Sequence, residues 1–199
     1  MGRAVRARGR RLVRIVAGTL RGRTIDGPKW DGLRPTSDSL RETLFNVLGP
    51  SIAGARVLDA FAGTGAVGIE AVSRGAAHAT FVERDPRAIT LIEHNITKLG
   101  VKNACAIIRG DFMRAPASLA GALAKAERFD LAFLDPPYEL PDLDDAIRRA
   151  GALLAPGGRV VAEHSRRREP APRIDGLSKY RTLTAGDSAL SFYTAVEGA

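Results

Sequence analysis

The residues best suited to chemistry are Asp135-Pro136-Pro137-Tyr138, which follow an apolar run. An aromatic amino group is a poor nucleophile because its lone pair is delocalised into the ring. The Asp135 carboxylate and the Pro136 carbonyl can each accept one N–H of such a group, which frees the lone pair for attack. The prolines fix φ and aim the carbonyl in advance, and Tyr138 can stack on a base that has left its helix. This turn predicts an enzyme that transfers a methyl group to an exocyclic amine of a base and that acts mostly by positioning the reactants. The alternative is a Pro-Pro turn with only a structural role.

A second turn, Asp59–Gly65 (DAFAGTG), also follows an apolar run and leads into a helical pattern. Gly63, Gly65 and Gly68 match G-x-G-x-x-G, a spacing that lets a ligand approach the backbone at a helix N-terminus. The spacing alone does not distinguish between NAD and S-adenosylmethionine as the cofactor. A carboxylate at Asp59 opposes a pyrophosphate but suits the cationic amino-acid end of S-adenosylmethionine, so we expect S-adenosylmethionine.

Two more acidic residues stand at the ends of later strand-like runs. Glu83 can accept both ribose hydroxyls, a role common to NAD and S-adenosylmethionine sites. Asp111 can accept a hydrogen bond from the adenine amino group, and Phe112 can pack on the ring. The alternative for each acidic residue is a helix N-cap or a loop position.

The elements around these turns alternate between strand-like and helical patterns. Helices are expected over 37–48, 66–74, 86–99, 117–126 and 143–154, and strands over 56–61, 79–83, 104–109, 129–134, 159–163, 180–184 and 189–195. A β-hairpin is expected on either side of Gly18, between Val13 and Ile25, followed by a loop. The alternation predicts an α/β fold with a central, mostly parallel seven-stranded sheet and helices on both faces. Ligands of such folds bind at the carboxyl ends of the strands, where both turns lie.

The positive charge of the chain is concentrated at its start. The net charge is +8, and residues 1–25 hold eight arginines and no acidic residue, which leaves 22 basic and 22 acidic residues in the remainder. Such an arm predicts a nucleic-acid partner, because each arginine that meets a phosphate releases counterions. A solvated tail without a partner is the alternative, and the arm lacks the apolar anchors of a lipid-binding segment. The candidate RNA-binding residues are Arg10, Arg11, Arg14, Arg21, Arg23 and Arg34.

Length and composition fit one cytoplasmic domain. The chain has 199 residues, of which 45% are hydrophobic, enough for a full core. No apolar run approaches the roughly 18 residues of a membrane span, and no apolar segment follows the basic start as in a secretory signal. Cys105 is the single cysteine, so we expect no internal disulfide. The histidines (His78, His94 and His164) show no ligand spacing, and we expect no metal.

These motifs together resemble the RsmD family, the bacterial 16S ribosomal RNA guanine-N2 methyltransferases. The resemblance covers nearly the whole chain from Arg14. The segments that carry it are Arg14–Gly18, Arg21–Arg23, Leu33–Asp38, Arg41–Asn46, Asp59–Gly65, Glu83–Asp85 and Asp135–Tyr138. Residues 34–46 are especially telling, because generic methyltransferases lack this segment.

The resemblance implies a Rossmann-like class I S-adenosylmethionine-dependent methyltransferase fold. It also implies methylation of one guanine at N2 in 16S ribosomal RNA, within the small subunit or its assembly intermediate, with S-adenosyl-L-homocysteine as the product. The protein is expected to be a monomer with a flexible basic arm (1–12), a hairpin and loop (13–35) and a methyltransferase domain (36–199).

The resemblance further implies that residues from Thr36 to Arg41 help to close the methionine end of the cofactor site. The full set of candidate cofactor-binding residues is then Thr36, Asp38, Arg41, Asp59, Phe61, Gly63, Thr64, Gly65, Glu83, Arg84, Asp111 and Phe112. The long arginine-rich start before Arg14 departs from the family pattern.

Two other functions remain open at this stage. The Asp135–Tyr138 tetrapeptide also occurs in DNA amino-methyltransferases that act on adenine N6 or cytosine N4, although the chain has no spare domain for reading a DNA sequence. A non-catalytic RNA-binding assembly factor with the same fold is the third possibility. The intact tetrapeptide and glycine turn argue against it.

Overall fold

The computed structural model describes residues 12–33, 36–114, 121, 123, 127–137 and 140–196. The helices are α1 (Asp38–Leu48), α2 (Ala66–Ser73), α3 (Pro86–Leu99) and α5 (Leu143–Gly151). The strands are β1 (Leu12–Arg14), β2 (Thr24–Asp26), β3 (Arg56–Asp59), β4 (His78–Glu83), β5 (Cys105–Arg109), β6 (Phe129–Leu134), β7 (Leu154–Ser165), β8 (Arg173–Ile174), β9 (Leu177–Ala185) and β10 (Ser188–Ala195). Short 3-10 turns cover Gly49–Ile52, Lys102–Ala104 and Phe112–Arg114.

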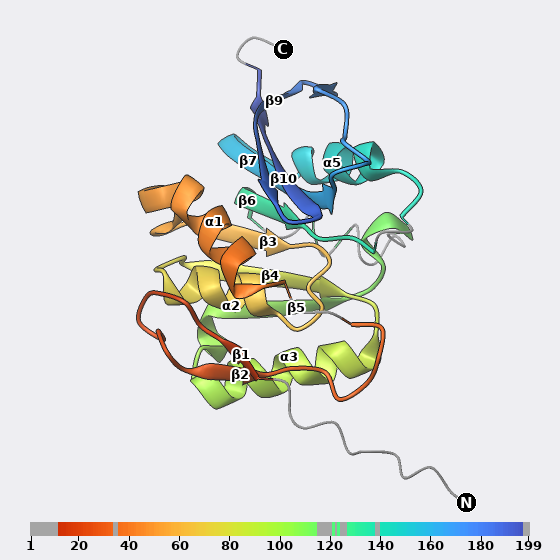
Figure 1. Ribbon diagram of the computed structural model, residues 1–199. Coiled ribbons are helices and arrows are strands. Elements are labelled where there is room, and N and C mark those ends of the chain that lie inside the picture. Colours follow the sequence, from red (N-terminus) through yellow and green to blue (C-terminus); the bar gives the residue numbers. More distant parts are fainter. Residues whose placement is uncertain are drawn as a thin grey trace, which may run out of the picture.

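One large sheet forms the centre of the molecule, with strand order β5-β4-β3-β6-β7-β10-β9-β8 (Figure 1). Its first five strands in this order run parallel, and β10 pairs antiparallel with both β7 and β9. The expected α/β class and the mostly parallel sheet are therefore confirmed. The sheet has eight strands rather than the expected seven, because the two-residue β8 pairs with β9 at the edge. Two residues are too few to show an alternating pattern in the sequence.

Helices cover both faces of the sheet, because the central strands carry apolar side chains on both faces. On one face, Val57 of β3 and Phe133 of β6 pack against apolar residues of α1 and α2. On the other face, Leu58 of β3 and Ala132 of β6 pack against α5. Neighbouring residues of a strand point to opposite faces, so each central strand contributes to both cores.

Residue types at the helix ends explain where the helices begin and stop. The Ser37 hydroxyl accepts the N–H of Leu40 at 3.2 Å and caps α1, as its position in the sequence predicts. Asp85 caps α3 in the same way, Pro86 occupies the first turn, and Gly100 ends the helix with φ of 74°. The expected bounds of α3 are confirmed.

The connection between α5 and β7 differs from the prediction. The helix ends at Gly151 rather than Leu154, and Leu154 already pairs with Phe129 of β6. The strand then continues through Pro156-Gly157-Gly158, where the ladder with β6 shifts register. Proline and glycine stop a helix, but an irregular strand tolerates them, so the pattern alone marks the wrong boundary. The helix expected over 117–126 falls largely outside the described residues.

The N-terminal hairpin is seated on α2 and α3. Strands β1 and β2 pair antiparallel, with Val13 opposite Ile25, which confirms the hairpin. The buried Glu70 of α2 accepts the N–H groups of Val16 and Ala17 at 2.8 and 2.9 Å. On α3, the buried Asn95 exchanges hydrogen bonds with the backbone N–H and C=O of Asp26. Because these contacts satisfy buried polar groups, they fix the hairpin in one position.

Gly18 packs directly against the backbone at the end of α2, and we predict that Gly18→Ala destabilises the protein strongly. Gly18 has φ of 84°, and a Cβ there would lie 1.8 Å from the Ser73 carbonyl oxygen. The substitution combines backbone strain with a clash against backbone, so we expect the free energy of unfolding in urea to fall by about 3 kcal/mol. Gly22→Ala is the matched control, since Gly22 has φ of 81° but open space around its Cβ position. It should cost only about 1 kcal/mol. Equal losses at the two glycines would contradict this seating of the hairpin.

Candidate active site

The carboxyl ends of five adjacent strands place acidic side chains along one edge of the sheet. Asp59 ends β3, Glu83 ends β4, Asp111 follows β5, Asp135 follows β6, and Glu163 lies near the end of β7. The strand order makes the strands that carry these residues neighbours. Both turns singled out in the sequence are therefore brought to the same edge, on the adjacent strands β3 and β6.

Asp59 is a buried carboxyl beneath the glycine turn. It is 2% exposed, and its Oδ2 accepts the N–H of Gly68 at 3.1 Å. Burial raises the pKa of Asp59 to about 7; the Gly68 hydrogen bond opposes this rise, and the nearby charges of Asp135 and Glu83 add to it. The ionised form of such a carboxyl is strongly stabilised by a cationic ligand.

Glu83 holds the glycine turn against the end of β4. Its Oε2 accepts the N–H of Gly63 at 2.8 Å, and its Oε1 accepts the N–H groups of Arg84 and Asp85, both at 2.8 Å. A carboxylate offers about four acceptor positions, so this network leaves room for one further donor. The expected contact with ribose hydroxyls stays a prediction.

Asp111 is tied to its neighbours on both sides. Its Oδ2 accepts a hydrogen bond from Arg84 Nη1 at 2.9 Å, and its Oδ1 accepts the Met113 N–H at 3.0 Å. Burial acts to raise the pKa of Asp111, but these donors outweigh burial and hold the pKa below its usual value. Phe112 is buried and meets Phe61 edge-on, with ring centroids 5.6 Å apart. Asp111 is thus an ionised acceptor, and its contact with adenine remains a prediction.

Asp135 lies between two side chains from distant parts of the sequence. Thr36 Oγ1 donates to Asp135 Oδ2 at 3.0 Å, and a hydrogen bond also joins Asp135 to Glu163. The register explains the second contact, because Leu134 of β6 is paired with Ala162 of β7. Burial raises the pKa of Asp135, and the two hydrogen bonds act in the opposite direction.

The segment before α1 reaches the site through Thr36, and Arg41 holds it there. Arg41 is 1% exposed; its Nη1 donates to the Thr36 carbonyl and its Nη2 to the Arg14 carbonyl, both at 2.6 Å. Its Nη2 also bonds Asp38 Oδ1 at 2.9 Å. The structure thus places Thr36 against Asp135, with Arg41 as a buried support for it. The expected contacts of Asp38 and Arg41 with the cofactor stay predictions.

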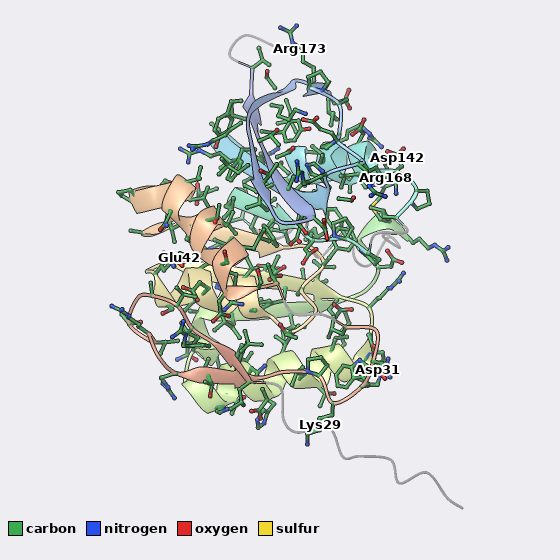
Figure 2. All side chains as sticks on the ribbon, viewed as in Figure 1. Lys29, Asp31, Glu42, Asp142, Arg168 and Arg173 are labelled. Carbon is green, nitrogen blue, oxygen red and sulfur yellow. The ribbon has the colours of Figure 1, made fainter. Side chains whose placement is uncertain are left out.

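The loop between β2 and α1 passes along the same edge of the sheet. The Leu33 side chain lies 3.0 Å from the position that a Cβ on Gly63 would take, and the guanidinium of Arg87 stacks over the Trp30 ring at 5.0 Å. Figure 2 shows Lys29 and Asp31 of this loop near the start of α3, away from the sheet. The loop therefore borders the glycine turn from outside.

The structure describes three of the six arginines expected to bind RNA. Arg14 and Arg21 are exposed, and Arg14 Nε lies 3.6 Å from Asp38 Oδ2. Arg23 donates to the carbonyls of Lys98 and Leu99, where it satisfies the C-terminal end of α3. Arg23 therefore has a structural contact that the charge pattern does not reveal. The remaining arginines (Arg10, Arg11 and Arg34) and Tyr138 lie outside the described residues.

Glu163 and Glu70 are the residues that the sequence reasoning missed. Glu163 is 9% exposed and ends the strand predicted at 159–163, so the end-of-strand position that singles out Asp59 and Glu83 also applies to it. Glu70 lies inside α2 and carries no comparable signal, because its partners Val16 and Ala17 are more than 50 residues away.

Within the described ranges, no group of three or more histidine, cysteine, aspartate or glutamate side chains is arranged to hold a metal ion. In the same part of the chain, no helix combines the length and apolar character that crossing a bilayer requires.

Comparison with known sequences identifies relatives over almost the whole chain. A family model described as Conserved hypothetical protein 95 matches residues 13–194. The protein YlbH of Bacillus subtilis (strain 168) is 35% identical over 183 residues, which span 91% of this chain and 98% of YlbH. Ribosomal RNA small subunit methyltransferase D of Escherichia coli (strain K12) is 40% identical over 135 residues, 68% of this chain and 65% of that protein.

Solved structures show the same architecture. The yhhF protein of Escherichia coli superposes with a TM-score of 0.78 at 34% identity, covering 92% of this chain and 98% of that one. An RNA methyltransferase from Salinibacter ruber, in complex with S-adenosyl-L-homocysteine, gives a TM-score of 0.61 at 19% identity over 83% of this chain and 96% of that one. At that identity the likeness shows the fold alone. The chain therefore belongs to the Conserved hypothetical protein 95 family, which is the RsmD family, and it has the fold of S-adenosylmethionine-dependent methyltransferases.

Proposed function

We propose that this protein transfers a methyl group from S-adenosylmethionine to N2 of one guanine in 16S ribosomal RNA. The observation that carries the proposal is the placement of the Asp59–Gly65 and Asp135–Pro137 turns on the adjacent strands β3 and β6. Asp135 lies close enough to Asp59 to raise its pKa. A donor at the first turn and an acceptor amine at the second would thus meet at one edge of the sheet.

The acidic edge suits a cationic cofactor. Asp59 is buried with a pKa of about 7, and Glu83 lies near enough to add to that rise. A pyrophosphate at this turn would meet two carboxylates of like charge, which disfavours a dinucleotide. When bound, S-adenosylmethionine supplies an electrophilic methyl group on a positively charged sulfur. Asp59 would pair with the cationic end of the cofactor, and Glu83 holds the glycine turn through its hydrogen bond with the Gly63 N–H.

The second turn provides the groups that act on the amine. Thr36 fixes one carboxylate oxygen of Asp135 by its hydrogen bond of 3.0 Å. Asp135 then accepts one N–H of the target amine, and the Pro136 carbonyl accepts the other. The nitrogen must lose a proton once it is methylated, and the raised pKa of Asp135 suits it to take up that proton. Tyr138 remains the proposed stacking residue.

Exposed arginines border the same edge and fit an RNA substrate. Arg166, Arg167 and Arg168 directly follow β7, and all three are exposed. Arg168 donates a hydrogen bond to the Pro141 carbonyl, in the loop that leads from the Asp135 turn to α5. Figure 2 shows Arg168 beside Asp142 in this region. Cationic side chains around a pocket can hold the phosphates that flank an extruded base. The names of the relatives support ribosomal RNA of the small subunit as the substrate.

The test is methyl transfer from labelled S-adenosylmethionine to three acceptors: small ribosomal subunits lacking the modification, free 16S RNA and duplex DNA. We expect label in the RNA of the small subunit, on N2 of a single guanine, as found by nucleoside analysis and mapping. Label mainly in DNA, on adenine N6 or cytosine N4, would overturn the proposal. No transfer together with no calorimetric binding of S-adenosylmethionine would instead support a non-catalytic assembly factor.

A further inference from the structure

Glu163 forms a carboxyl pair with Asp135 but has no role in the chemistry described so far. Glu163 is 9% exposed, lies next to Asp135 across the β6–β7 ladder, and shares a hydrogen bond with it. Two carboxyl groups in such contact cannot both be ionised without strong repulsion, so they hold one proton between them. Burying a second carboxyl beside a catalytic one costs stability, which suggests that Glu163 has a function in the site.

Thr36 restrains the orientation of one carboxyl group of this pair. Its hydroxyl donates to Oδ2 of Asp135 and so restrains the rotation of that carboxyl group. Asp135 is therefore held in one orientation between Thr36 and Glu163. A base that enters the site can meet two acceptors side by side, one from each carboxyl group.

Two adjacent acceptors match one base in particular. On its Watson–Crick edge guanine presents N1–H and N2–H side by side, whereas adenine and cytosine present their amino group next to a bare ring nitrogen, which repels a carboxylate. Enzymes that extrude a base read this edge by hydrogen bonds. We propose that Glu163 is the residue that selects guanine, by accepting the N1–H while Asp135 accepts an N–H of the 2-amino group. When the base binds, the shared proton is released to solvent, and the two N–H groups of the base take its place as donors to the pair. This inference rests on the proposed function.

The experiment compares guanine with 2-aminopurine at the methylated position of small subunits reconstituted with the altered RNA. 2-Aminopurine keeps the 2-amino group but has an unprotonated N1. We expect the wild-type protein to methylate guanine about tenfold faster or more, the range that one well-placed base contact supplies. In Glu163→Gln the amide N–H can donate to N1 of 2-aminopurine, so the preference for guanine should fall to near parity or reverse.

The fluorescence of 2-aminopurine gives a second readout that requires no methyl transfer, because the fluorescence rises when the base leaves its stack. It should rise more with Glu163→Gln than with wild type.

Glu169→Gln is the matched control, because Glu169 is an exposed glutamate in the loop that follows β7, where it pairs with Lys179 at 2.8 Å. It should keep the wild-type preference. An equal loss of rate on both bases in Glu163→Gln would make Glu163 only a positioning residue for Asp135 and would overturn the inference. A wild-type protein that methylates guanine but does not discriminate against 2-aminopurine would also overturn it, while the proposed function would stand. A wild-type protein that transfers no methyl group to guanine would overturn both.

Discussion

Asp135→Ala is expected to lower the rate of methyl transfer about a hundredfold or more. The substitution removes an acceptor that is held in place by Thr36 at 3.0 Å, and pre-positioned groups of this kind account for losses of that size when they are deleted. Affinity for S-adenosylmethionine should change only a few-fold, because Asp59 and Glu83 stay in place. The measurement is single-turnover transfer of labelled methyl to small subunits, with cofactor binding followed by calorimetry.

Asp130→Ala serves as the control for this substitution. Asp130 lies at the other end of β6 and is exposed, where it accepts the backbone N–H of Arg56 at 2.8 Å. This variant should transfer methyl groups at close to the wild-type rate. If Asp135→Ala kept the wild-type rate as well, the catalytic role of the Asp135–Pro137 turn would be wrong.

The parts of the fold that follow from the sequence are those set by local patterns. The strand at Phe129–Leu134 and the helix at Pro86–Leu99 are flanked by a turn or by capping residues, so their bounds match the prediction. The end of α5 and the start of β7 are predicted wrongly at Pro156-Gly157-Gly158. These residues lie within a strand because Leu154 pairs with Phe129, which is a tertiary contact. The strand β8 is missed since two residues carry no periodicity.

In the candidate site, too, local patterns predict some features and only tertiary contacts reveal the others. Residues at the ends of parallel strands are predictable, because the fold class alone places Asp59, Glu83 and Asp135 at one edge. The partners of these residues are not predictable, since they come from the register and from long-range docking. Thr36 reaches Asp135 from 99 residues away in the chain, and the sequence pattern does not encode that contact. The proximity of Glu163 to Asp135 becomes visible only once β6 and β7 are aligned.

Asp59 leads to a prediction about both stability and binding, because its pKa of about 7 is far above the usual value of 3.8. A raised carboxyl pKa means that the folded state holds the proton more tightly than the unfolded state. The stabilising contribution is complete below pH 3.8 and is lost as the pH rises through about 7. At pH 5, which lies about one unit above the unfolded pKa, part of this contribution is already lost, so Asp59→Asn should be more stable than wild type by about 1.5 kcal/mol. At pH 8 it should be more stable by about 2–4 kcal/mol in the absence of ligand.

The same proton should make cofactor binding depend on pH. If Asp59 pairs with the amino group of S-adenosylmethionine, its proton must leave on binding, so affinity should rise about tenfold between pH 5.5 and 7, where the ligand amino group stays charged. Methylthioadenosine, which has neither the amino group nor the sulfonium charge, should bind with little change over this range. In Asp59→Asn the affinity for S-adenosylmethionine should be lower and independent of pH. A wild-type affinity that stays constant from pH 5.5 to 7 would mean that the cation is held elsewhere, and the buried charge at the end of β3 would then need another partner.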